Sequence, residues 1–256
     1  MAILVALFGL VWGSFLNVVG LRLAAGGSLL TPPSHCPNCQ TRLRPIDLFP
    51  VASFFWLGGK CRYCRAPISV LYPVGELATA LLFLAVYARF GWSGEAVVGW
   101  ILVSLLLAAC ISDLSQMTIP NGITAVGAIV LLLSRLLFPS AHGLGNDLFA
   151  FFLGGGILYV VHLLAKEGMG MGDVKLMAMS GLALGWEQTL LALFLASAMG
   201  ALTGSVLLLT GRLKRRQPFP FGPFLAGGAI VSFLFGDSLF SFYTPFYFLG
   251  GFIFMK

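Results

Sequence analysis

Two acidic residues border long apolar stretches of the sequence. Asp113 closes one apolar run, and Asp173 opens another, directly after the glycines Gly170 and Gly172. Two carboxyl groups that meet cannot both ionise, so they share a proton. The ionised member can then deprotonate a water molecule while the protonated one polarises a carbonyl group. These residues predict the chemistry of an aspartic protease, with Asp113 and Asp173 as the catalytic pair.

The surroundings of the two acids favour this interpretation over a plainer one. Gly170 and Gly172 place no side chain just before Asp173, so the backbone of a substrate could come close. The plainer interpretation is that each acid only marks the end of a helix. Asp173 would suit a helix N-terminus, but Asp113 would lie at a C-terminus, where the helix dipole opposes a negative charge.

Four of the five cysteines form two C-x-x-C pairs, separated by 21 residues. The four are Cys36, Cys39, Cys61 and Cys64. One such turn places two thiolates on one side of a metal ion, and a second turn completes a tetrahedral site. The alternatives are two disulfides or four free thiols, and a reducing cytoplasmic location disfavours disulfides. The spacing therefore predicts a structural metal ion, Zn²⁺.

The composition defines the class of protein that must position these residues. Hydrophobic residues make up 59% of the 256 positions and charged residues 9%, whereas a soluble domain has roughly 25% charged residues. This excludes a water-soluble globular protein and a disordered chain. Five cysteines are too few for a disulfide scaffold of this length. We expect an all-α polytopic membrane protein of about eight transmembrane helices in the lipid bilayer. The net charge of +6 indicates cytoplasmic loops rather than nucleic-acid binding.

The apolar runs divide the chain into three parts. They cover about 2–23, 71–90, 96–112, 121–138, 146–165, 174–186, 188–211 and 221–236, with an ambiguous last run at 239–255. We predict a first transmembrane helix at 1–23 and a small cytoplasmic zinc-binding loop at 24–70. Residues 71–256 would then form the helical bundle that carries the two aspartates.

The basic residues predict how this bundle lies in the membrane. When the connections are assigned alternately to two sides, twelve of the fifteen Lys and Arg fall on one side. Positive residues stay in the cytoplasm, so the N-terminus would lie outside. Asp113 and Asp173 would then share the cytoplasmic end of the bundle.

Two other classes of function compete with a protease. A transporter with a zinc-stabilised loop could use the aspartates to bind a cation, but transporters typically show paired broken helices in two halves, and we find none in the sequence. A zinc-ribbon scaffold that recruits partners would leave Asp113 and Asp173 without a purpose.

The ordered set of motifs resembles the bacterial prepilin peptidases (type IV leader peptidases), which are GxGD-type intramembrane aspartyl proteases. The segments that carry the resemblance are Gly13–Val19 with Arg22, the double C-x-x-C loop, Tyr72-Pro73 with Glu76, Asp113–Asn121, Gly170–Lys175 and Pro220–Ala226. They follow one another in the family's order along nearly the whole chain.

This resemblance implies two activities at the cytoplasmic face of the bacterial cytoplasmic (inner) membrane. The first is removal of the basic leader from type IV prepilins or type II secretion pseudopilins. The second is N-methylation of the new N-terminus with S-adenosylmethionine, although a peptidase-only member of the family is an alternative. The sequence has no glycine-rich Rossmann loop, so the methyl donor would bind between the first spans and the cysteine loop. Glu76 is a candidate contact there, or else it pairs with an arginine of the loop.

Overall fold

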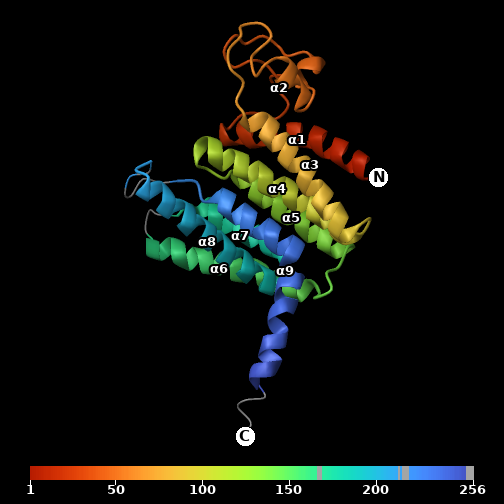
Figure 1. Cartoon of the computed structure of the whole chain (residues 1–256), viewed down its shortest axis with the longest axis vertical. Helices are drawn as coiled ribbons and strands as arrows, with labels where there is room; N and C mark the ends of the chain where they lie inside the picture. Colours follow the sequence, from red (N-terminus) through yellow and green to blue (C-terminus); the bar gives the residue numbers. More distant parts are fainter. Residues whose placement is uncertain (166–168, 213, 215–218, 252–256) are drawn as a thin grey trace.

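The computed structural model describes residues 1–165, 169–212, 214 and 219–251, and this part of the chain is all-α (Figure 1). The long helices are α1 (Ala2–Ala24), α3 (Leu71–Phe90), α4 (Gly94–Gln116), α5 (Asn121–Leu137), α6 (Leu144–Ala165), α7 (Met171–Leu184), α8 (Trp186–Leu209) and α9 (Gly222–Gly251). The loop between α1 and α3 carries two short helices, η1 (Pro45–Leu48) and α2 (Ala52–Trp56). Each predicted apolar run forms a helix, so the predicted class is confirmed.

The helices differ in their capacity to cross a bilayer. Within the described residues, six are long and apolar enough to span it, namely α1, α3, α4, α6, α8 and the first part of α9. The apolar helix α5 has 17 residues and α7 has 14. At 1.5 Å per residue α7 rises about 21 Å, less than the roughly 30 Å of a hydrocarbon core. The expected eight crossings thus correspond to six helices of spanning length and two shorter ones.

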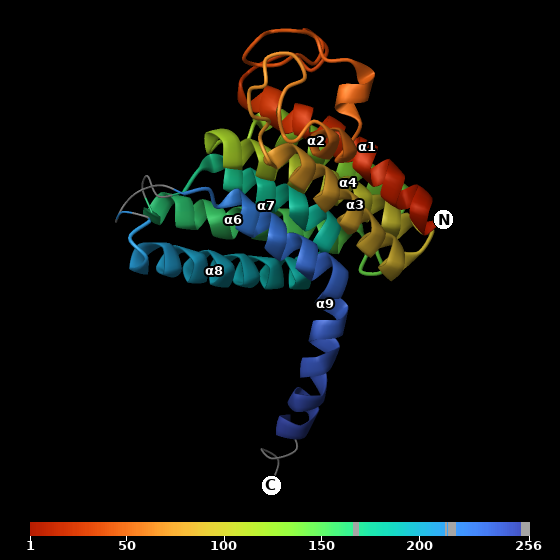
Figure 2. The same ribbon diagram turned by 45° about the horizontal axis from the view of Figure 1, so that its top comes forward.

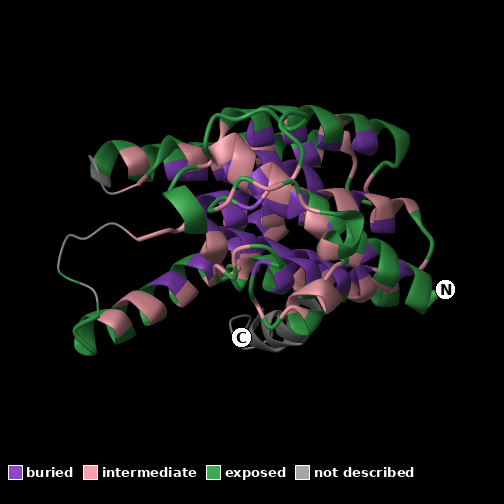
Figure 3. Cartoon of the chain, turned by 90° about the horizontal axis from the view of Figure 1, so that it is seen from above, coloured by how far each residue is buried: buried purple, intermediate pink, exposed green. Residues whose placement is uncertain are grey.

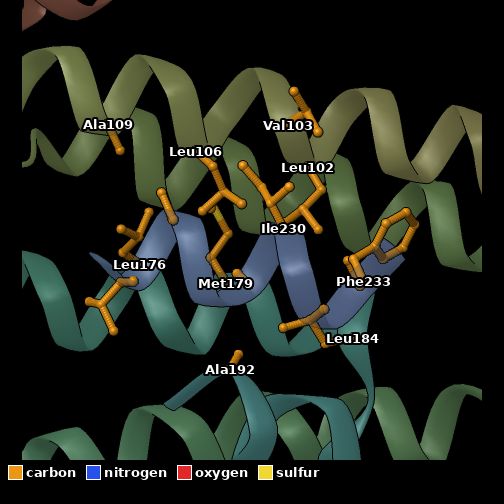
Figure 4. Close-up of a cluster of buried hydrophobic side chains, with 14 of the residues drawn as sticks. Leu102, Val103, Leu106, Ala109, Leu176, Met179, Leu184, Ala192, Ile230 and Phe233 are labelled. Carbon is orange, nitrogen blue, oxygen red and sulfur yellow. The ribbon is translucent and has the colours of Figure 1, made fainter. Parts of the chain in front are cut away.

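The short helix α7 lies at the centre of the bundle. It contacts α4, α5, α6, α8 and α9, and it is buried from Asp173 on along nearly its whole length. Figure 4 shows its Leu176, Met179 and Leu184 packed among apolar side chains of α4, α8 and α9. Protein rather than lipid surrounds this helix, so its length need not match the bilayer. Exposed residues lie on the outer faces of the bundle (Figure 3), and many of them are large and apolar.

Successive long helices alternate in direction, which gathers specific turns at one end of the bundle (Figures 1 and 2). This end collects the last turns of α1, α4, α6 and α8, and the first turns of α3, α5, α7 and α9. Residues 25–70, the cysteine loop, leave from it. At the far end of the chain, α9 continues past Pro245 to Gly251 as one helix, so the ambiguous last run does not begin a new helix. Residues 252–256 lie outside the described part.

A buried ion network ties the helices together at the opposite end of the bundle. The Arg135 guanidinium lies 2.6 Å from the Glu95 carboxylate and 3.9 Å from that of Asp147. It also donates to the carbonyl oxygens of Leu182 and Ala183 in the last turn of α7. A cation at a helix C-terminus stabilises the carbonyl groups that have no partner within the helix. Arg135 therefore holds the end of α7 that lies farthest from Asp173.

Candidate active site and metal centre

Asp113 lies in the last turn of α4 and meets the beginning of α9. Its Oδ2 accepts a hydrogen bond of 2.8 Å from the backbone N–H of Gly222, the first residue of α9. The side chain is buried, with 5% of the residue exposed. The N–H groups at a helix N-terminus favour a negative charge. The beginning of α9 therefore offsets the unfavourable dipole that Asp113 would otherwise feel at the end of α4.

Asp173 lies in the first turn of α7 and shares this site. It is 8% exposed, and its helix packs against α4, which carries Asp113. Both carboxyl groups therefore lie at one end of the bundle, as the alternation of the helices predicted. The two predicted catalytic residues, 60 positions apart in the sequence, are thus buried at the same end of the bundle on two helices that pack together.

The two glycines before Asp173 have different surroundings. A Cβ on Gly172 would lie only 2.8 Å from the Cβ of Ile119, in the segment that joins α4 to α5. A Cβ on Gly170 would meet nothing closer than Oδ2 of Asp173, at 3.7 Å. Gly172 thus permits the α4–α5 connection to pack against the beginning of α7. Of the two glycines, only Gly170 keeps the open space that we expected for a substrate.

Substituting these two glycines is expected to give unequal effects on stability. Gly172→Ala forces the backbone near Ile119 to move, and such overpacking lowers the free energy of unfolding by about 1–3 kcal/mol. Gly170→Ala meets ordinary van der Waals contacts and serves as the matched control. Thermal unfolding of the purified variants measures the difference. Equal losses would show that the contact with Ile119 does not matter.

The loss of stability caused by substituting Gly222 is expected to depend on the side chain of Asp113, again measured by thermal unfolding. A Cβ on Gly222 would lie 2.8 Å from Oδ2 of Asp113, so Gly222→Ala should lower the free energy of unfolding by about 1–3 kcal/mol. Much of this loss should disappear in an Asp113→Ala background, which removes the carboxyl group and leaves only the Cβ of residue 113, at 3.2 Å. Gly227→Ala, on the same helix, is the control, because its Cβ would meet only the flexible end of Met199 at 3.4 Å. The same loss in both backgrounds would contradict the coupling.

The four cysteines of the two C-x-x-C pairs converge in the loop. Their Sγ atoms all lie within 4.8 Å of one another, and those of Cys36 and Cys64 are 3.8 Å apart. A disulfide would need about 2.05 Å. A tetrahedral site with metal–sulfur bonds of about 2.3 Å has sulfur–sulfur edges of about 3.8 Å. The cluster therefore fits four thiolate ligands around one metal ion.

The two cysteine turns are built alike. In each, the N–H of the first cysteine donates to a carbonyl oxygen five residues on, at Thr41 and Ala66. The residue after the second cysteine has a positive φ in each, 56° at Gln40 and 60° at Arg65. The Asn38 amide beside Cys64 lowers the pKa of that thiol to about 6. This favours the thiolate that a metal ligand requires.

Glu76 connects the loop to the membrane helices. It lies on α3, is buried, and accepts a hydrogen bond of 2.7 Å from the backbone N–H of Val51. No salt bridge to Glu76 occurs among the described residues. The loop contact that we considered for Glu76 thus exists, but its partner is a backbone group rather than an arginine.

A cavity of about 370 Å³ lies between α1, the loop and α3. This is within the roughly 300–1,000 Å³ of small-molecule sites. Its lining combines charged, hydroxyl and aromatic groups, among them Ser14, Arg22, His35, Phe54, Tyr72 and Glu76. The cavity is therefore separate from the site of the two aspartates.

Some contacts of the site were not apparent in the sequence. The Pro220–Ala226 segment was noted, but nothing in it indicates that the N–H of Gly222 bonds to Asp113. Lys175 donates a hydrogen bond of 2.7 Å to Oδ1 of Asn121. Nothing in the local sequence indicates that Lys175 pairs with Asn121, the first residue of α5.

Comparison with known proteins gives two family matches. Residues 7–90 match the family described as Bacterial Peptidase A24 N-terminal domain. Residues 100–205 match the Type IV leader peptidase family. The first match includes the cysteine loop and Glu76, and the second includes both aspartates.

Curated relatives match along nearly the whole chain. A protein of Bacillus subtilis (strain 168) is 40% identical over 241 residues, which cover 93% of this chain and 95% of the relative. A protein of Aeromonas hydrophila is 36% identical, covering 92% and 91%. One of Pseudomonas aeruginosa is 35% identical, covering 94% and 92%. All three are named prepilin leader peptidase/N-methyltransferase. No solved structure matches the chain.

Proposed function

Because the chain belongs to the type IV leader peptidase family, we propose that it is a prepilin leader peptidase and N-methyltransferase. It removes the leader peptide from a prepilin or pseudopilin and then methylates the new N-terminus. The observation that supports the peptidase activity is the burial of Asp113 and Asp173 at the same end of the bundle, on the packed helices α4 and α7. The methyltransferase activity follows the double name of the relatives.

For cleavage, we propose that the two aspartates act on one water molecule. The ionised carboxylate takes a proton from the water, whose oxygen attacks the carbonyl carbon of the scissile peptide bond. The protonated carboxyl group donates a hydrogen bond to the carbonyl oxygen as negative charge develops there. When the C–N bond breaks, the leader keeps the new carboxylate and the mature pilin receives a proton on its new amine. Burial of both acids excludes other water from this step.

We propose that the aspartates face the cytoplasm from the cytoplasmic membrane. The cysteine loop leaves from the same end of the bundle and carries five basic residues and one acidic residue, a net charge of +4. At the other end, Arg135 is paired with Glu95, and Arg89 lies 3.9 Å from Asp237. The positive-inside rule counts Lys and Arg, and their excess at the loop end favours the cytoplasmic side for that end.

We propose that S-adenosylmethionine, which would supply an electrophilic methyl group, binds in the cavity between α1, the loop and α3. The residues present fit such a ligand. Glu76 is a buried carboxylate without a salt bridge to any described residue, and it would complement a sulfonium cation. Phe54 and Tyr72 offer apolar surface for an adenine ring, and Arg22 offers a cation for a carboxylate.

We also propose a division of labour along the chain. The first helix at 1–23, the loop at 24–70 and the beginning of α3, with Tyr72 and Glu76, would form the methyl-transfer part. The bundle at 71–256 would carry the protease site. Cys36, Cys39, Cys61 and Cys64 would hold one Zn²⁺, whose role is to fold the loop. Four thiolates leave no open position on the ion, so this zinc is structural.

Incubation of the purified enzyme with a prepilin, with and without labelled S-adenosylmethionine, tests both activities at once. We expect a shift in gel mobility under both conditions, and label on the mature pilin only when the donor is present. Cleavage without label would identify a peptidase-only member of the family. Uncut prepilin would contradict the proposed function.

Glu76→Gln is expected to separate the two activities. Loss of the charge should weaken binding of labelled S-adenosylmethionine, measured by equilibrium dialysis, and reduce methyl transfer. Cleavage should stay near the wild-type rate, because Glu76 is not part of the aspartate site. Glu187→Gln, an exposed acid in the first turn of α8, is the control for charge. Unchanged binding of the donor would place the methyl-donor site elsewhere.

A further inference from the structure

Three aromatic side chains of the cysteine loop point away from the rest of the protein. Phe49, Phe55 and Trp56 are 60%, 72% and 53% exposed, and we call them the loop aromatic patch. The rings of Phe49 and Trp56 stack with their centroids 6.1 Å apart. Their neighbour Phe54 has the opposite orientation and lines the cavity. One short helix, α2, therefore has an inner and an outer aromatic face.

The hydrogen bond between Val51 and Glu76 ties the segment that carries this patch to α3. Val51 directly precedes α2, and Glu76 lies five residues after the first residue of α3. At 1.5 Å per residue, the bond lies about 7.5 Å along α3 from its beginning. Surface-bound amphipathic segments bury their apolar face about 5–10 Å into the headgroup and acyl boundary. The bond therefore holds the segment before α2 beside the second turn of a membrane helix, at a distance from the helix beginning that is similar to this interfacial depth.

The positive charge of the loop is complementary to an anionic membrane surface. Exposed basic residues surround the patch in the sequence, and the acid Asp47 is paired with Arg62 at 2.6 Å. The exposed basic residues are Arg42, Arg44, Lys60, Arg62 and Arg65. Aromatic residues with nearby Lys and Arg are typical of segments that lie at an anionic membrane interface. A basic leader peptide would be repelled by the same charges.

We propose that the loop aromatic patch is an interfacial anchor, which inserts into the headgroup region of a bilayer that contains anionic phospholipid. The anchor would hold the cysteine loop against the membrane surface beside α1 and α3. Trp56 and Phe49 contribute amphipathic or apolar ring surface at this depth. The basic side chains of the loop attract the phosphate groups of the lipid.

Tryptophan quenching in vesicles tests this anchor on the full chain. The wild type and Trp56→Phe are reconstituted into phosphatidylcholine–phosphatidylglycerol vesicles whose acyl chains are brominated near the headgroup. The difference between the two emission spectra isolates Trp56. We expect brominated lipid to quench most of this difference, and acrylamide in the water to quench little of it. Replacing phosphatidylglycerol by phosphatidylcholine should weaken the quenching by lipid.

A tryptophan elsewhere in the loop is the matched control. Tyr63→Trp in the Trp56→Phe background places the probe on the second cysteine turn, at a residue that is 40% exposed. It should be quenched by acrylamide and not by brominated lipid. Three results would overturn the proposal: free access of acrylamide to Trp56, equal lipid quenching at both positions, or protection of Trp56 only when a prepilin is added. An unchanged signal without phosphatidylglycerol would remove the preference for anionic lipid.

Discussion

Asp113→Asn and Asp173→Asn are each expected to lower the rate of prepilin cleavage by a factor of about 10²–10⁴, the contribution of general acid–base catalysis. An amide preserves the size of the side chain, but it cannot accept a proton from water. The N–H of Gly222 can still donate to an amide oxygen at position 113, so the bundle should stay folded. A gel-mobility assay with purified prepilin measures the rate.

The control for this experiment is an aspartate away from the site. Asp237→Asn removes an exposed carboxylate on α9 that bonds Gln188, and it should cleave at the wild-type rate. Unfolding temperatures of all three variants show whether a loss of rate reflects misfolding. A folded Asp113→Asn or Asp173→Asn enzyme with near wild-type cleavage would refute the aspartate pair.

Cys61→Ser is expected to remove the bound metal and to reduce methyl transfer more than cleavage. In zinc-finger peptides a structural Zn²⁺ contributes about 10–16 kcal/mol of apparent binding free energy, which is also folding free energy. Losing one thiolate should therefore unfold the cysteine loop, together with the cavity that it lines. The aspartates lie on α4 and α7, which pack mainly against other membrane helices, so part of the cleavage activity should remain.

Elemental analysis, thiol titration and the two activity assays measure this outcome. The wild type should hold one zinc per chain, and Cys61→Ser should hold almost none. Cys110→Ser is the matched control, because Cys110 lies on α4 outside the cluster, and the zinc content should not change. Four freely titrating loop thiols without metal, under reducing conditions, would refute the zinc site. Equal losses of cleavage and methylation would show that the loop serves both activities.

Much of the architecture could be read from local features of the chain. Apolar runs predict membrane helices, because a bilayer selects for length and hydrophobicity alone. The C-x-x-C spacing predicts a thiolate pair, because the turn brings its own two cysteines together. Counting the helices also placed Asp113 and Asp173 at one end, since each crossing reverses the direction of the chain. None of these steps requires knowledge of which helices touch.

The short length and central position of α7 could not be predicted from these local features. A run of 13 apolar residues was expected to be a span like the others, but α7 is a short helix enclosed by five neighbours. Helices that are apolar on every side carry no periodic signal of which face meets protein and which meets lipid. Only the packing shows that α7 is the central helix and that its first turn, with Asp173, lies against the α4–α5 connection.

Membrane insertion, helix order and the metal-binding turns were therefore determined by the sequence itself, since each depends on composition or on a spacing of a few residues. The contacts of the aspartates were decided only by the tertiary structure. Gly222 lies 109 residues from Asp113. Ile119, in the α4–α5 connection, packs against Gly172 in the first turn of α7. Glu76 likewise bonds a backbone group of the loop, which no side-chain pattern encodes. Such contacts arise from close packing between distant segments, where a single methyl group is enough to change the fit.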